Sequence, residues 1–177
     1  AHRQRASFML VRRRNSLPLP PIIRLATRDD ARAIAALSRT EIEQGLPWRW
    51  TPPRVQRAVA DARTNVCVAV QQASLHGFGI MVYADDTAHL SLLAVDPNAR
   101  RQGVGTALLL WLEQVAGVAG IERVQLEARR SNAAALAFYR RHGYQQTDTV
   151  AGMYLGVEDG VRLQKRLGLQ ASVDTPP

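Results

Sequence analysis

The sequence has a single cysteine and no long apolar run. Cys67 is the only cysteine among 177 residues, so no disulfide can form within the chain. It lies in a predicted strand, where we expect a small core residue rather than a nucleophile. A chain without disulfides is typical of a reducing compartment and predicts a cytoplasmic protein. No stretch approaches the roughly 20 apolar residues of a membrane span, and the N-terminal segment lacks the build of a secretory signal, so we expect no membrane partner.

Acidic residues are missing from the first 28 positions. This segment carries seven arginines and neither Asp nor Glu, whereas the formal net charge of the whole chain is +8. The other 16 basic and 15 acidic residues leave positions 29–177 close to neutral. A nucleic-acid-binding face on the folded part is therefore not expected. The arginine-rich arm alone keeps one alternative open, a nucleic-acid-associated factor.

Length and composition predict one folded domain. A chain of 177 residues with 46% hydrophobic and 21% charged residues suits a single core. Residues 1–21 combine arginine clusters with three prolines, and we expect a basic extension that is flexible or that contacts a partner, such as a second subunit of a homodimer. The domain would cover residues 22–169, and residues 170–177 would form a C-terminal tail.

Strand and helix patterns alternate along the domain. Alternating apolar residues and turn signals predict strands over 22–27, 65–71, 77–83, 87–95, 121–128, 144–150 and 161–167. Capping residues and helical periodicity predict helices over 30–44, 52–63, 104–118 and 133–142. In the third helix the spacing predicts a buried stripe of Val104, Leu108, Trp111, Val115 and Val118. The fold class is therefore α/β, a mixed sheet crossed by four helices.

A glycine turn separates the fourth predicted strand from the third helix. Gly103 and Gly105 let the backbone approach a bulky anion, and the N–H groups at the helix start can hold phosphate oxygens. Arg100 and Arg101 add positive charge. The turn lacks the third glycine of a dinucleotide fingerprint and the Gly-Lys-Ser/Thr of a P-loop, which excludes the two commoner phosphate loops.

Together these parts resemble the GNAT superfamily of acyl-CoA N-acyltransferases. The pattern Arg-x-x-Gly-x-Gly at 100–105, which follows LLAVDP, is similar to the pyrophosphate-binding signature of that family. The stretches LEARRSNAAA (126–135) and FYRRHGY (138–144) are similar to the protein N-terminal alanine acetyltransferases that act on ribosomal proteins. The detailed resemblance covers residues 90–144, and a weaker one in the order of elements covers residues 22–167.

The resemblance implies a fold and a cofactor. We expect a mostly antiparallel sheet of six or seven strands with about four helices packed on both faces, and acetyl-CoA as the acyl donor. Strand residues near 93–95 would offer backbone N–H groups to the pantetheine arm and the thioester carbonyl, and Asn132 would hydrogen-bond the cofactor arm. The expected cofactor-binding residues are Leu93, Ala94, Val95, Arg100, Arg101, Gln102, Gly103, Val104, Gly105, Thr106, Asn132 and Tyr139.

Two residues are expected to move protons, because the amine must lose a proton and the leaving sulfur must gain one. Glu127 lies at a strand end on the polar side and would act as the base, directly or through water. Tyr139, twelve positions later, would donate a proton to the sulfur. The alternatives are a solvated Glu127 and a core-packing Tyr139. His89, expected on the same strand face as Ser91 and Leu93, is either a satisfied histidine or a helper in proton transfer.

The acceptor is expected to be a primary amine, either a protein N-terminus or a small molecule. An α-amine needs about 3 kcal/mol less to deprotonate than a lysine amine. The resemblance implies that the first two helices and their loop form the acceptor pocket, which gives Glu41, Glu43, Trp48 and Trp50 as candidates. No metal is expected. A catalytically silent acyl-CoA-binding module remains an alternative function.

Overall fold

The computed structural model describes residues 20–168. The basic extension and the C-terminal tail expected from the sequence lie outside the described residues, apart from the last two positions of the extension.

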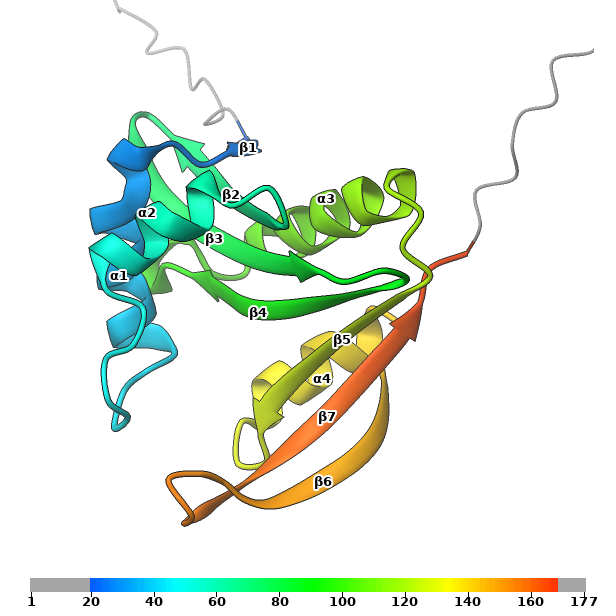
Figure 1. Ribbon diagram of the computed structural model, residues 1–177. Coiled ribbons are helices and arrows are strands. Elements are labelled where there is room, and N and C mark those ends of the chain that lie inside the picture. Colours follow the sequence, from blue (N-terminus) through cyan, green and yellow to red (C-terminus); the bar gives the residue numbers. More distant parts are fainter. Residues whose placement is uncertain (1–19, 169–177) are drawn as a thin grey trace, which may run out of the picture.

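A seven-stranded mixed sheet forms the centre of the protein (Figure 1). The strand order is β1-β2-β3-β4-β5-β7-β6, and every neighbouring pair is antiparallel except β4 with β5. The expected α/β class with a mostly antiparallel sheet is therefore confirmed. The strands are β1 (Ile22–Leu25), β2 (Thr64–Gln71), β3 (Ser74–Tyr83), β4 (Thr87–Val95), β5 (Arg123–Arg129), β6 (Gln145–Tyr154) and β7 (Glu158–Arg166).

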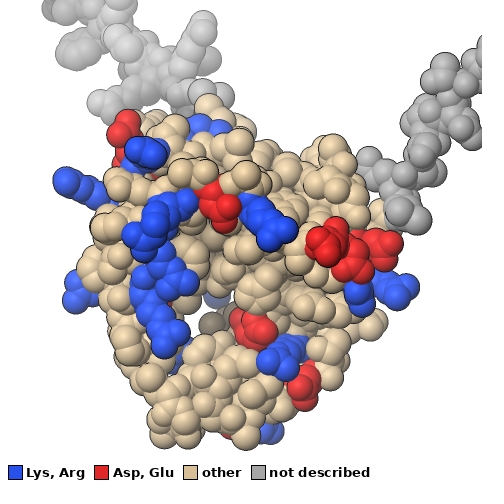
Figure 2. All heavy atoms as spheres, in the orientation of Figure 1, with Lys and Arg blue, Asp and Glu red and all other residues tan. Residues whose placement is uncertain are grey.

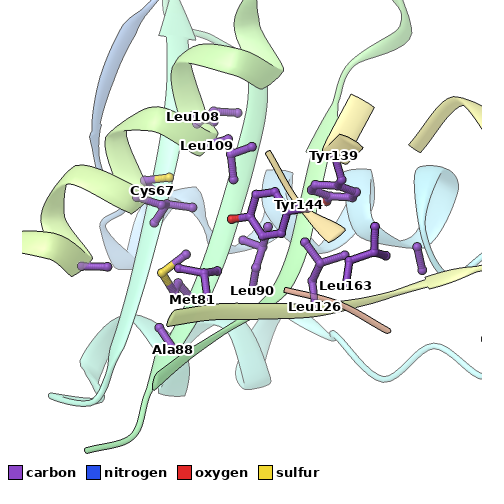
Figure 3. Close-up of a cluster of buried hydrophobic side chains, with 14 of the residues drawn as sticks. Cys67, Met81, Ala88, Leu90, Leu108, Leu109, Leu126, Tyr139, Tyr144 and Leu163 are labelled. Carbon is purple, nitrogen blue, oxygen red and sulfur yellow. The ribbon is translucent and has the colours of Figure 1, made fainter. Parts of the chain in front are cut away.

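Four α-helices cover the two faces of the sheet. They are α1 (Ala31–Glu41), α2 (Pro52–Ala60), α3 (Val104–Val118) and α4 (Ala133–Arg141), and two short 3-10 turns, η1 (Arg28–Asp30) and η2 (Pro97–Ala99), precede α1 and α3. Buried residues of α1 and α2 form one hydrophobic cluster with the sheet. Those of α3 and α4 form a second cluster, in which Tyr139 and Tyr144 lie side by side near Leu126 and Leu163 (Figure 3).

The sheet splits between β4 and β5. These parallel strands pair only where residues 87–89 oppose residues 123–125, and beyond that point they diverge (Figure 1). Backbone groups on the open side of β4 then have no neighbouring strand to bond with. The split creates the space in which the candidate active site lies.

A β-bulge at Ser91 changes the faces of β4. Leu90 and Leu92 oppose successive residues of β3, so Ser91 is an extra residue between them. As a result Leu90 packs in the α3–α4 cluster and Leu92 in the α1–α2 cluster. Leu93 packs on the α3 side. The expectation that His89 shares a strand face with Leu93 is wrong, because strict alternation stops at the bulge.

The predicted stripe on α3 is also wrong in part. Val104 and Leu108 are buried as expected, but Trp111 is only half-buried and Val118 is 80% exposed. The buried face continues instead in steps of four and contains Val104, Leu108, Leu109, Leu112 and Ala116. This helix is apolar around most of its circumference, so the sequence allows more than one apolar stripe.

Glu113 is a charged residue buried in the α3 interface, 8% exposed. Its carboxylate accepts hydrogen bonds from the Tyr144 hydroxyl at 2.9 Å and from the Lys165 ammonium at 2.6 Å. This cluster connects α3 to β7 and to Tyr144, which lies between α4 and β6. A buried carboxylate is tolerated because both oxygens have partners.

Loss of this cluster is expected to destabilise the protein strongly. Glu113→Ala leaves the Lys165 ammonium without its buried partner, which lowers the free energy of unfolding by about 3 kcal/mol. The exposed neighbour Gln114 provides the control, and Gln114→Ala should change stability by less than about 0.5 kcal/mol. Urea unfolding of both variants measures the difference, and equal stabilities would show that the cluster contributes little.

Candidate active site

The split between β4 and β5 opens into a cavity of about 480 Å³. Figure 2 shows a hollow on this face of the molecule, with acidic and basic side chains at its edge. Both strands contribute lining residues, and so do the end of α1 with its following loop, the start of α4, and β6. The lining includes residues 90–93, residues 127–129, Glu41, Asn132, Tyr139 and Tyr154.

The start of α3 has the geometry of an anion site. Gly103, the N-cap, adopts a left-handed φ of +77°, and no side chain caps the helix. Arg101 is also left-handed, with a φ of +60°. Alternation of left-handed and right-handed backbone conformations points successive N–H groups into one concave space. The helix dipole favours negative charge there. Gly105 brings the helix close to Val95 and Phe138, whose atoms would lie 3.4–3.5 Å from an added Cβ.

Arg100 and Glu41 form an ion pair between the glycine turn and the end of α1. Arg100 was expected to bind the cofactor and Glu41 the acceptor, so the structure brings these two predicted sites into contact. Glu41 is mostly buried and lines the cavity, whereas Arg100 is more than half exposed.

Asn132 caps α4 and lines the cavity. Its side-chain oxygen accepts a hydrogen bond from the backbone N–H of Ala135 at 3.1 Å. This bond satisfies one of the free donors at the helix start. The side-chain amide group of Asn132 is then the part that can donate to a ligand.

Tyr139 packs in the core and also borders the cavity. Its ring packs edge-on against Phe138 and Tyr144, with centroids 5.2 and 5.5 Å away, and the residue also lines the cavity. Burial raises the pKa of the Tyr139 hydroxyl well above its usual value. The hydroxyl therefore stays protonated at neutral pH and can act only as a proton donor there.

Glu127 lies on β5 with two polar partners. Its Oε2 atom lies 2.5 Å from Nε2 of His89, and its Oε1 atom accepts a hydrogen bond from Nε of Arg162 at 3.4 Å. The carboxylate is partly exposed and borders both the main cavity and a neighbouring one of about 330 Å³. Glu127 and Tyr139 thus line one cavity, from a strand and from the following helix.

Glu43, a candidate for acceptor binding, holds its own loop. It is 7% exposed, and its carboxylate accepts hydrogen bonds from the backbone N–H groups of Arg49 and Trp50 and from the Ser38 hydroxyl. These distances run from 2.7 to 3.2 Å. All the observed contacts of Glu43 stay within α1 and the loop.

The two tryptophans lie away from the main cavity. Trp48 packs under the Arg39 guanidinium at 5.0 Å and borders a separate surface cavity on α1. Trp50 packs under Arg54 at 4.3 Å. Of the four candidate acceptor residues, the structure brings only Glu41 to the main cavity.

Arg129 is a cavity residue that the sequence analysis missed. It donates hydrogen bonds to the carbonyls of Ile42 and Gln44 at 3.3 and 3.0 Å, and to Glu158 at 3.2 Å. Its guanidinium also lies 5.4 Å from the ring of Tyr154, a second missed lining residue. Arg129 thereby joins the loop after α1 to the β6–β7 hairpin. Its position two residues after Glu127 was the only available signal.

The described part of the chain contains neither a candidate metal site nor a candidate nucleophilic cysteine. Within residues 20–168 no three His, Cys, Asp or Glu side chains gather to hold a metal ion. Burial raises the pKa of the Cys67 thiol to about 12, so this cysteine is not a nucleophile. None of the helices described is long and apolar enough to cross a bilayer.

The sequence matches known proteins over this same region. The model of the acetyltransferase (GNAT) family matches residues 29–144. The chain is 38% identical over 90 residues to the ribosomal protein bS18-alanine N-acetyltransferase of Escherichia coli (strain K12), a match that covers 51% of this chain and 60% of that protein. It is 27% identical over 146 residues to the aminoalkylphosphonate N-acetyltransferase of Salmonella typhimurium, which covers 79% of this chain and 95% of that protein.

Solved structures share the fold. The ribosomal-protein-S18-alanine N-acetyltransferase from Escherichia coli superposes with a TM-score of 0.71 at 26% identity, over 89% of this chain and 99% of that chain. The PaiA N-acetyltransferase from Thermoplasma acidophilum, solved in complex with coenzyme A, superposes with a TM-score of 0.73 at 19% identity, over 84% and 99% of the two chains.

The family match includes every element that lines the cavity except β6. It contains the glycine turn before α3, the cap of α4, and both Glu127 and Tyr139. From this match and the shared fold, we conclude that the chain belongs to the acetyltransferase (GNAT) family.

Proposed function

We propose that this protein transfers the acetyl group of acetyl-CoA to a primary amine by direct attack in a ternary complex. The observation that carries this proposal is the cavity between β4 and β5, in which a carboxylate and a protonated tyrosine face one space. A reaction that removes a proton from an amine and adds one to a sulfur needs one group of each kind. The activity would take place in the cytoplasm.

Acetyl-CoA supplies the thioester that holds the acetyl group. The residues of this chain fit it, because the start of α3 has uncapped N–H groups in an anion-binding geometry. Backbone amides of residues 102–106 would hold the pyrophosphate, with Arg101 adjoining. Backbone groups of residues 93–95, beyond the last β4–β5 pair, would orient the acetyl end, and Asn132 would bind the arm.

Glu127 and Tyr139 would carry the proton transfers. The Glu127 carboxylate takes the proton of the acceptor amine, directly or through water. The Tyr139 hydroxyl, which burial keeps protonated, donates a proton to the departing sulfur. Glu41 lies on the same cavity wall, where its carboxylate is already paired with Arg100.

Two acceptor classes are supported by different relatives. The relatives named as ribosomal-protein-alanine N-acetyltransferases favour a protein N-terminus, whose α-amine is easier to deprotonate than a lysine. The aminoalkylphosphonate N-acetyltransferase favours a small amine, and it is matched over nearly its whole length. An acyl-CoA-binding module without catalysis is the alternative function.

Calorimetry and turnover with acetyl-CoA test the proposal directly. We expect heat of binding with acetyl-CoA alone, and release of free thiol when a panel of peptides with N-terminal alanine, aminoalkylphosphonates and simple amines is added. Absence of binding would overturn the proposal. Binding without turnover on any amine would establish the silent module instead.

Substitution of the helix-start glycine should separate ligand binding from backbone strain. Gly103 and Gly120 both have positive φ angles and open space around an added Cβ, and they lie at opposite ends of α3. Each change to alanine costs about 1 kcal/mol of stability. Only Gly103→Ala should weaken acetyl-CoA binding, by about tenfold or 1.4 kcal/mol. Equal binding by both variants in calorimetry would place the pyrophosphate elsewhere.

Removal of the Tyr139 hydroxyl should slow the reaction without weakening the fold. Tyr139→Phe keeps the ring contacts with Phe138 and Tyr144, and we expect kcat to fall about 100-fold while the Kd of acetyl-CoA changes little. Tyr83→Phe is the control, because this hydroxyl accepts a hydrogen bond from Asn65 away from the cavity. Unchanged turnover of Tyr139→Phe would show that another group protonates the sulfur.

A further inference from the structure

Three polar side chains from β4 and β5 form a continuous hydrogen-bonded chain on the cavity wall. The Ser91 hydroxyl lies 3.2 Å from Nδ1 of His89, and Nε2 of the same ring lies 2.5 Å from the Glu127 carboxylate. Ser91 and Glu127 line the cavity. His89 lies between them with 44% of its side chain exposed. The three hydrogen-bonded side chains therefore connect the cavity to solvent.

The fold places these groups together at the point where the sheet splits. His89 occupies the last paired position of β4 and β5, opposite Gln125, and the bulge follows at Ser91. Glu127 is two residues beyond Gln125 on the diverging strand. The side chains that bond across the opening therefore come from the last paired residue of β4 and from the residues just beyond the split.

The hydrogen-bond chemistry fixes a direction along this chain. An ionised carboxylate only accepts, so Nε2 of His89 must carry the hydrogen that lies toward Glu127. In the neutral ring Nδ1 is then an acceptor, and it faces the Ser91 hydroxyl as donor. In this arrangement the lone pair of Nδ1 points at the Ser91 hydroxyl, from which it can take up a proton.

Charged side chains from two neighbouring strands lie around His89 and its partner Glu127. Glu127 faces the His89 ring from β5. On β3, the residue paired with His89 is the apolar Val82. Arg162 of β7 bonds the other oxygen of Glu127, and Asp148 of β6 lies 3.6 Å from Arg162. Among the ion pairs of the described residues, His89 pairs directly with a carboxylate, and Arg162 divides its charge between Glu127 and Asp148.

We propose that Ser91, His89 and Glu127 form a proton relay that carries the proton of the acceptor ammonium out of the cavity. An N–H bond of the ammonium breaks and its proton binds the Ser91 oxygen, while the hydroxyl proton of Ser91 passes to Nδ1 of His89. The resulting imidazolium is balanced by the Glu127 carboxylate and releases the proton to water. No electrons change hands. The inference rests on the proposed acetyl transfer and replaces proton uptake by Glu127 itself, because His89 accepts the proton while the Glu127 carboxylate orients the ring.

The tautomer of His89 tests the relay without any substrate. In ¹⁵N NMR of the imidazole nitrogens, the neutral ring of His89 in the full chain should carry its hydrogen on Nε2. Ser91→Ala should shift the Nδ1 resonance and leave Nε2 nearly unchanged. A neutral ring with its hydrogen on Nδ1 would overturn the relay, whatever the outcome of acetyl-transfer assays.

Kinetics then separate proton transfer from a structural role. His89→Gln should lower kcat at neutral pH about 100-fold with unchanged affinity for acetyl-CoA, because the relay acts as a general base. The loss should shrink as the pH rises above the pKa of the acceptor amine, about 8 for an α-amine, since the free amine needs no relay. Added imidazole should restore part of the rate of His89→Ala.

Matched variants complete the test. Ser91→Ala should lower kcat with the same pH dependence, whereas Ser91→Thr keeps the hydroxyl and most of the rate. His76→Gln, on β3 outside the cavity, should retain wild-type turnover. A loss in His89→Gln that is equal at every pH and resists imidazole would overturn the relay. Wild-type turnover in the same assay reports on acetyl transfer itself, so the two ideas fail separately.

Discussion

The three residue pairs between β4 and β5 are the constraint on which the candidate site depends. They hold the two strands together at one end, and the loss of pairing beyond His89 opens the cavity at the other. A fully paired sheet would bury these backbone groups in a ladder and leave no room for a ligand. The bulge at Ser91 follows at once, so the same few residues decide both the opening and the direction of the side chains around it.

Contacts on both faces hold the two halves of the split sheet in place. On the α3 side, Glu113 binds Tyr144 and Lys165 and so ties α3 to β7. On the α1 side, Arg129 binds the loop after α1 and the β6–β7 hairpin, whose carbonyl and carboxylate groups would otherwise lie far apart. Polar side chains on both faces of the sheet therefore connect segments that lie far apart in the sequence.

Local signals in the sequence predicted most of the fold and the family to which the chain belongs. Strand β4 and helix α3 have the expected bounds, and the glycine turn and the Asn132 cap lie where their residue types require. The faces of α3 and β4 were not predictable, since one helix is apolar nearly all round and one strand contains a bulge. The role of Arg129 was also out of reach, because its carbonyl partner at Gln44 is 85 residues away. Sequence reasoning finds caps and turns, whereas contacts between distant segments need the structure.

Electrostatics divides the site into two regions with different demands. At the start of α3 the backbone N–H groups have no side-chain cap, and the nearby Arg100 side chain is already paired with Glu41. Backbone amides keep their positions at any salt concentration, which suits a phosphate that must be held in one place. On the β5 side of the cavity, the Glu127 carboxylate shares its charge with His89 and Arg162. The two regions therefore differ in kind, since uncapped backbone N–H groups form one and a carboxylate with polar side-chain partners forms the other.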